Sequence, residues 1–366
     1  NDWKKWERNR KKHREKRNMG GTVGYAQDYE RLDKFLREYG SNWRHGYQEQ
    51  AADGQVKTVN QLGMPAPRYS FSKELNSKKL KGKFVIMNFW STWCGGCRAL
   101  CQDLDSIMVK GSDEYRDVQI IGVNYKENLV DKGYKAREWW EQKAFGYPTT
   151  DDNKGVEEFS TAVHAGHPTM MLIDDRGIIR GRWDAWSPGT AANAALAVWV
   201  LKIVPQQGVT LDLDLARQYM KEKNYLRVLY ILEGLPETDE TRLMKLEALL
   251  HESSYQAGIF IGKLMENAKE QANYGMLLGI AQIVERTEVY SSFCKIGLEA
   301  VSLHNRQSKR ADDDSWILEY KLKFRYGKQM QMEAERAIDE RIRIYGEDKS
   351  NKDELSVWEQ ARKELK

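Results

Sequence analysis

The chain has 366 residues, 41% of them hydrophobic, and this is enough to form more than one hydrophobic core. Residues 1–17 carry nine Lys and Arg against three Asp and Glu, so the net charge of +4 comes from this arm and the rest of the chain stands at −2. Only the arm is basic, which excludes a broad nucleic-acid-binding surface, and no apolar run is long enough to cross a bilayer.

The basic arm is predicted to be a helix that begins after Asp2 and carries two tryptophans on a narrow face. One interpretation is peripheral contact with an anionic membrane surface. We favour a solvated helix after a removed signal or anchor segment, because the chain begins with Asn1 rather than Met. A short amphipathic helix over residues 32–39 follows, whereas residues 41–54 show no periodicity and support no prediction. We assign residues 1–59 to the arm and its short helices.

The next predicted domain, residues 60–204, contains the motif around which the chain is organised. Residues 65–71 hold two prolines and then alternating aromatics, which predicts an extended segment and a short edge strand. Residues 84–87 are continuously apolar and are followed by Asn88, Phe89 and Trp90, which favours a strand buried on both faces. This strand ends at a W-C-G-G-C turn, residues 93–97, after which apolar residues recur at helical spacing. We therefore predict a helix that begins at Cys97.

A C-x-x-C motif between a buried strand and a helix is typical of a thiol-disulfide redox site. The unpaired N–H groups and the dipole of the helix start favour negative charge, so Cys94 is biased toward the thiolate that attacks a disulfide. Cys97 lies one turn further on and is placed to resolve the mixed disulfide. A zinc knuckle shares this spacing but needs a second pair of ligands, and only the loosely spaced His164 and His167 follow. We predict no metal site.

The rest of this domain alternates predicted strands and helices, which indicates an α/β fold with a central mixed sheet flanked by helices. Residues 151–155 are a predicted turn whose acidic pair caps the next helix, and residues 175–177 are a predicted hairpin turn. The predicted strands cover residues 118–125, 169–174 and 178–183, and the predicted helices include residues 138–140 and 191–200.

The order of these motifs resembles the TlpA-like thioredoxin-fold proteins, which include extracytoplasmic reductases that serve cytochrome c maturation. The resemblance runs from about residue 60 to residue 204. It is carried by G-x-P-A-P at residues 63–67, W-C-x-x-C at residues 93–97, a strand that ends at Asn124, and G-x-P-T at residues 166–169. It implies a thioredoxin fold with a redox-active Cys94–Cys97 disulfide, no other cofactor, and Pro168 in the cis form against the disulfide.

The resemblance also implies which residues face the substrate. It places His167 at a lip where backbone groups pair with an incoming peptide like an added strand. Without the resemblance, His167 would be interpreted as a solvent-exposed loop histidine. The residues implied to shape the active site or to bind substrate are Trp93, Gly95, Gly96, His167, Pro168 and Thr169.

Two positions depart from the family pattern. Many TlpA-like reductases carry a Glu three residues after the second cysteine and often a Pro two residues further on, but this chain has Leu100 and Gln102 there. Glu127 is the candidate that replaces the missing proton acceptor, and the alternative is a solvated loop carboxylate. Cys101 lies on the same helix face as the redox cysteines, so the three thiols cannot surround an ion. We interpret Cys101 and the distant Cys294 as buried, small, apolar side chains.

After residue 208 the composition changes to helix-forming residues without strand signals. Residues 209–366 are predicted to form an all-α domain of helical hairpins, and its first unit resembles a degenerate tetratricopeptide-type repeat. This domain is either a scaffold that binds a partner protein or a stabilising appendage.

Together these patterns predict an extracytoplasmic, for example periplasmic, thiol-disulfide oxidoreductase. It is expected to reduce disulfides of protein substrates and to be recharged by an upstream electron donor. The alternative is a protein-interaction scaffold whose helical domain binds a partner and whose redox site is secondary or vestigial. A peroxiredoxin is disfavoured, because the P-x-x-x-T-x-x-C spacing of a peroxidatic cysteine is absent, although Thr92 precedes Cys94.

Overall fold

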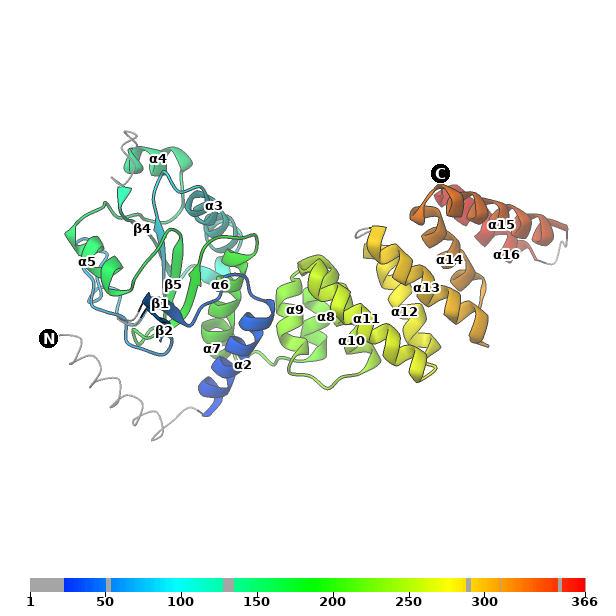
Figure 1. The fold of residues 1–366 in the computed structure, drawn as a ribbon, viewed down its shortest axis with the longest axis horizontal. Coiled ribbons are helices and arrows are strands. Elements are labelled where there is room, and N and C mark those ends of the chain that lie inside the picture. Colours follow the sequence, from blue (N-terminus) through cyan, green and yellow to red (C-terminus); the bar gives the residue numbers. More distant parts are fainter. Residues whose placement is uncertain are drawn as a thin grey trace. The chain divides into compact units, whose positions relative to one another are not determined.

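The computed structural model describes residues 23–50, 54–127, 135–287, 291–309, 311–347 and 351–365. The basic arm over residues 1–17 lies outside these ranges, so its predicted helix and its membrane contact stay predictions. The chain divides into two compact units, Asn1–Thr210 and Leu211–Lys366 (Figure 1). Among the described helices, none combines the length and the apolar character that a membrane crossing requires.

A four-stranded mixed sheet lies at the centre of the first unit. Its strands β3 (Val85–Trp90), β4 (Gln119–Asn124), β5 (Thr169–Ile173) and β6 (Ile179–Asp184) take the order β4-β3-β5-β6. The pair β3–β4 is parallel, whereas β5 is antiparallel to both of its neighbours. Every residue of β3 is buried, as its continuous apolar run predicted. The predicted mixed sheet with flanking helices is confirmed.

Helices cover both faces of the sheet. On one face α3 (Gly95–Leu104) and α6 (Thr190–Val198) contact each other and the sheet. Because side chains alternate along a strand, the other side chains of β3 face a second core, which is completed by α5 (Lys154–Ala162). The remaining helices of this unit are α2 (Val23–Tyr39), α4 (Ala136–Lys143) and α7 (Val204–Gln207).

Three local predictions about this unit are wrong. Helix α3 begins at Gly95, two residues earlier than predicted, because Cys94 itself is the N-cap. The cap of α5 is Asn153, whose side chain accepts the backbone N–H of Val156, rather than the acidic pair before it. Residues 69–71 do not form the predicted edge strand, since the β-pairing of this segment is a single isolated bridge between Ser70 and Asn76.

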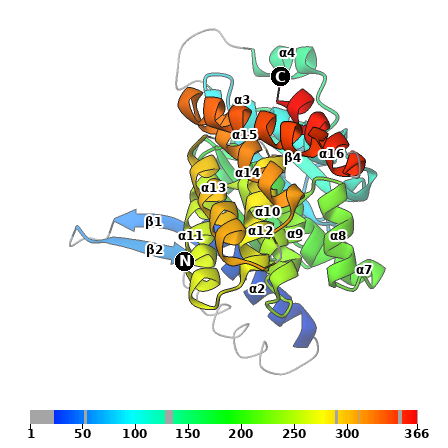
Figure 2. The ribbon, with the colours of Figure 1, turned by 90° about the vertical axis from the view of Figure 1, so that its right-hand side faces the viewer.

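A β-hairpin precedes the sheet, where residues 1–59 were assigned to the arm and its short helices and residues 41–54 supported no prediction. Strands β1 (Gly46–Gln50) and β2 (Val56–Asn60) pair antiparallel as a separate two-stranded sheet, which projects from the unit in Figure 2. Just before the hairpin, Trp43 bridges to Trp183 of β6, so the base of the hairpin is joined to the edge of the main sheet.

The second unit is helical throughout its described residues. Successive helices contact one another, and α10, α12, α14 and α16 also form a contacting series, as in stacked helical repeats. The helices are α8 (Leu213–Lys221), α9 (Tyr225–Leu232), α10 (Asp239–Glu252), α11 (Ser254–Glu270), α12 (Tyr274–Thr287), α13 (Ser291–Gln307), α14 (Asp313–Tyr326), α15 (Lys328–Glu347) and α16 (Lys352–Glu364).

Candidate functional site

The site lies where the buried strand β3 passes into helix α3. Cys94 and Cys97 form a disulfide, while Cys101 and Cys294 are free and buried. The Cys94 Sγ also accepts the backbone N–H of Cys97 at 3.1 Å. A thiolate at position 94 would therefore lie against the first turn of α3, where unpaired N–H groups favour negative charge. Cys94 is 8% exposed and Cys97 is fully buried, so Cys94 is the more accessible sulfur.

The loop that carries Pro168 lies against the cysteine turn, and its His167–Pro168 bond is cis, as the resemblance implied. A Cβ atom added to Gly96 would lie 3.7 Å from Pro168 Cδ and 3.3 Å from Trp186 Cβ. Gly96 therefore lies between the proline loop and Trp186, with little room for a side chain. Gly95 faces open space, because an added Cβ would meet no atom within 4 Å.

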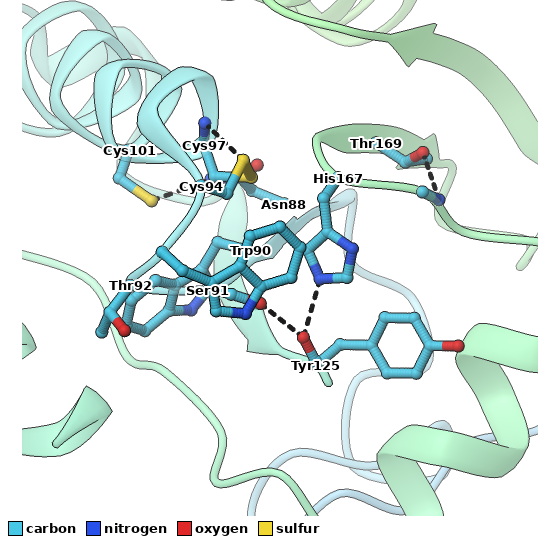
Figure 3. The surroundings of a disulfide bond; sticks show 12 residues. Asn88, Trp90, Ser91, Thr92, Cys94, Cys97, Cys101, Tyr125, His167 and Thr169 are labelled. Carbon is cyan, nitrogen blue, oxygen red and sulfur yellow. Dashed lines mark hydrogen bonds between the residues drawn. A yellow bond between two sulfur atoms is a disulfide. The ribbon is translucent and has the colours of Figure 1, made fainter. Parts of the chain in front are cut away.

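The carbonyl of Tyr125, which follows β4, accepts hydrogen bonds both from the segment before the cysteine turn and from the proline loop (Figure 3). It accepts the Oγ hydroxyl of Ser91 at 2.5 Å and the ring Nε2–H of His167 at 2.7 Å. Burial lowers the pKa of His167, so its imidazole is neutral at pH 7 and donates through this one nitrogen. The ring of Trp93 lies 4.8 Å from that imidazole, and its Nε1–H donates to the Lys126 carbonyl at 3.1 Å.

Thr169 supports the proline loop from inside rather than facing a substrate. Its side chain is buried, and its Oγ1 donates to Asp184 Oδ1 at 2.8 Å. The same Oγ1 accepts the backbone N–H of Gly166 at 2.9 Å. These two bonds fix the loop on either side of Pro168, which gives Thr169 a shaping role without a direct contact to the cysteines.

Glu127 is held close to the cysteine turn by three donors. Its carboxylate accepts the backbone N–H of Thr92 at 3.2 Å, the Thr92 hydroxyl, and the Nδ2–H of Asn124 at 2.6 Å. Its own backbone N–H donates to Asp152 Oδ2 at 3.1 Å, and burial raises the pKa of that aspartate. Within the described residues, none of its hydrogen bonds reaches either redox cysteine. The Glu127 carboxylate is thus held against Thr92, which lies two residues before Cys94 in the sequence. It is not a freely solvated carboxylate.

Cys101 occupies a different environment beneath the same helix. The Nδ2–H of Asn88 donates to its Sγ at 3.1 Å, and the Tyr147 hydroxyl donates to its carbonyl at 3.1 Å. Burial raises the pKa of Cys101 to about 12, so it stays a thiol at neutral pH. Leu100, which departs from the family pattern described above, is fully buried. Among the described residues, no group of three His, Cys, Asp or Glu is arranged to hold a metal ion.

The structure thus places Pro168 against Gly96 in the cysteine turn and Trp93 beside His167, and it adds residues that sequence reasoning missed. Trp186 contacts the Gly96 region and donates to Asp103 Oδ2 at 2.8 Å, and Thr92 and Ser91 anchor the loop after β4. These residues carry no motif of their own, because their contacts join positions more than 30 residues apart in the chain.

Comparisons with known proteins agree with this geometry. The model of the AhpC/TSA family matches residues 55–182, which include both redox cysteines and Pro168. The chain is 33% identical over 142 residues to the thiol:disulfide interchange protein DsbE of Tatumella citrea, which is 36% of this chain and 71% of that protein. It is 32% identical over 127 residues to the thioredoxin-like protein YneN of Bacillus subtilis (strain 168), which is 33% of this chain and 69% of that protein.

A solved structure of a thiol:disulfide interchange protein of the thioredoxin family from Chlorobium tepidum TLS covers 40% of this chain and 98% of its own, with 22% identity and a TM-score of 0.30. The family model covers the part of the chain that holds β3, the cysteine turn and the proline loop, in agreement with the TlpA-like resemblance. The chain therefore belongs to the family of thioredoxin-fold thiol:disulfide interchange proteins, which are thiol-disulfide oxidoreductases.

Proposed function

We propose that the protein is an extracytoplasmic reductase of disulfides in protein substrates, with Cys94 as nucleophile and Cys97 as resolving thiol. The observation that carries this proposal is the Cys94–Cys97 disulfide at the start of α3, in which the more accessible sulfur also faces the helix N–H groups. The location follows from the resemblance to TlpA-like extracytoplasmic reductases. The names of the DsbE relatives support interchange with protein thiols.

The proposed reaction begins from the dithiol form. The Cys94 thiolate attacks one sulfur of a substrate disulfide, so a Cys94–substrate bond forms, the substrate S–S bond breaks, and the leaving thiolate takes up a proton. Cys97 then loses its proton and attacks the Cys94 sulfur, which releases the second substrate thiolate. The substrate gains two electrons and two protons, and the protein is left with the Cys94–Cys97 disulfide. An upstream protein dithiol restores the reduced form by the reverse exchange.

The proline lip supplies a docking edge for the substrate chain. His167 uses its side chain to bind Tyr125, but within the described residues its backbone N–H and C=O form no hydrogen bond. These two groups lie next to the cysteine turn, because Pro168 contacts the Gly96 region. An extended substrate segment can pair with them as an added strand and present its cysteine to Cys94.

Glu127 is the proposed acceptor of the proton that Cys97 loses. Its three hydrogen-bond donors hold the carboxylate beside Thr92, two residues before Cys94 in the sequence, and a positioned carboxylate can act as a general base. In this proposal the second unit, Leu211–Lys366, offers a surface for a partner protein, as stacked helical repeats commonly do.

The two cysteine variants test the proposal. Cys94→Ser should abolish reduction of a protein disulfide, because the attacking thiolate is gone. Cys97→Ser should accumulate mixed disulfides with substrate, which non-reducing gels and mass spectrometry detect. Cys294→Ser, in the second unit, is the matched control and should behave as wild type.

If the Cys94 variant accumulated mixed disulfides with substrate and the Cys97 variant did not, the roles of the two cysteines would be reversed. A folded wild-type protein that reduces no disulfide would favour the alternative, a scaffold with a vestigial redox site. Equilibration with glutathione buffers gives the direction of electron flow, and a pair more oxidising than glutathione would contradict a reductase.

A further inference from the structure

A pocket of about 840 Å³ lies beside the proline lip and is not used by the chemistry described above. One wall is the proline loop, which contributes residues 164–169, and another is the start of the β1–β2 hairpin. The lining also includes Ser160 and Thr161 of α5, Tyr125 and Lys126 after β4, and the end of β6. His167 and Pro168 belong both to the lip and to the pocket. A substrate segment that is bound at the lip can therefore extend into this pocket.

The hairpin wall is fixed in place. Tyr47 of β1 is 9% exposed, and its ring stacks on His164 with centroids 3.6 Å apart and an interplanar angle of 8°. The Nη2 of Arg182 donates to the His164 carbonyl at 2.8 Å, and this hydrogen bond holds His164 in position beneath the Tyr47 ring. At Gly46 an added Cβ would lie 1.7 Å from the carbonyl oxygen of Val59, so only glycine allows the strands to approach here.

The pocket is positively charged at its rim. Arg44 and Lys126 are both exposed, and within the described residues neither forms an ion pair. The third cation, Arg182, is buried and pairs with Asp184 at 3.0 Å, so it is already compensated. Two carboxylates lie nearby: Asp184 lines the pocket and pairs with Arg182, and Glu49 stands opposite Lys57 in the hairpin register and acts electrostatically on the Tyr47 and His164 side chains. Among the described residues, Arg44 and Lys126 are therefore the rim cations that have no ion-pair partner.

We propose that this pocket is a subsite of the substrate groove that binds a segment of the substrate protein with an acidic side chain near its reactive cysteine. The inference rests on the proposed function, since it assigns the occupant to the chain that pairs with the lip. An extended segment fits because Gln48, which lines the pocket, is exposed, and among the described residues β1 pairs with β2 alone, so its other edge is open. The family model matches residues 55–182, and strand β1 precedes them. The hairpin wall of the pocket that β1 forms is therefore a feature of this chain that the family model does not cover.

The test uses two disulfide-linked peptides that differ only in Glu or Gln at the positions flanking the cysteine. The readout is the ratio of kcat/KM for the Glu peptide to that for the Gln peptide, which cancels any general effect on the redox centre. We expect wild type to prefer the Glu peptide by about threefold to tenfold, as two exposed ion pairs allow. This preference should shrink in 0.5 M salt because exposed charges are screened.

The double variant Arg44→Glu, Lys126→Glu should invert the ratio, and the single variant Lys126→Glu should lower it by an intermediate amount. The double variant Lys78→Glu, Lys81→Glu is the matched control, because it makes the same charge change at exposed positions outside the pocket, and its ratio should equal that of wild type.

A wild type that reduces neither peptide contradicts the proposed function itself. A wild type that reduces both at equal rates keeps the proposed function and overturns the acidic subsite. An unchanged ratio in the Arg44, Lys126 variant also overturns the subsite, as does an equal loss of preference in the Lys78, Lys81 control.

Discussion

The two ends of helix α3 hold three cysteines in opposite chemical environments. At the N-terminal end, Cys94 caps the helix, is the more accessible partner of a disulfide and faces a loop of polar groups. One turn beyond Cys97, Cys101 is enclosed by Asn88 and Tyr147, and burial raises the pKa of its thiol. Residue type is the same at both ends, so access and position along the helix decide which sulfur reacts.

The two ends also differ in how the backbone continues. Position 102, where the family pattern described above often has a proline, is Gln, and α3 passes into a π-helical turn at Asp105–Val109. Asp105 is buried there, accepts the backbone N–H of Gly146 at 2.8 Å and pairs with Lys110 at 2.5 Å. The C-terminal end is therefore a structural anchor, whereas the N-terminal end is left open for chemistry.

The largest expected effect is on thiol reactivity. In the reduced protein at pH 7, iodoacetamide should alkylate Cys94 at least about a thousandfold faster than Cys101, because a thiol with a pKa of about 12 is ionised in about one molecule in 10⁵. Mass spectrometry of timed samples measures both rates, and in urea the two rates should converge. Comparable rates in the folded protein would remove the distinction between the two ends.

The next effect is on stability. Cys101→Ala deletes the acceptor for the Asn88 amide and should lower the free energy of unfolding by about 1–3 kcal/mol. Cys101→Ser keeps an acceptor and should lose less. Hydrogen exchange of the β3 amides in urea reports on this unit alone. Disulfide reduction should continue at the wild-type rate in both folded variants, and a loss of turnover would show that Cys101 takes part in exchange.

The smallest expected effect compares the carboxylates at the two ends. Glu127→Gln should slow the attack of Cys97 on the mixed disulfide by about tenfold near neutral pH, the low side of general-base catalysis. Stopped-flow release of the second substrate thiol, followed from acid to alkaline pH, measures this step. Asp105→Asn is the matched control and should lower stability without changing the rate profile. Identical profiles for wild type and Glu127→Gln would leave Glu127 as a positioning residue only.

The sequence by itself determined the features that local pattern encodes. The apolar run of β3, the cysteine turn at a helix start and the change of composition after residue 208 are visible because burial and helical spacing repeat over a few adjacent residues. The C-x-x-C motif at a helix start indicated the Cys94–Cys97 redox pair, whereas the cis form of Pro168 came from the resemblance, and both are present in the structure.

The tertiary structure alone decided the surroundings of these features. The hairpin strands are mostly polar and exposed, so no alternation marked them, and their position comes from the Tyr47–His164 stack and the Trp43–Trp183 contact. In the same way, contacts between distant parts of the chain supply the partners of Glu127 and the Asn88 and Tyr147 hydrogen bonds of Cys101, although the burial of Cys101 itself was predicted. Such contacts depend on how the sheet and helices pack, which no short stretch of sequence specifies.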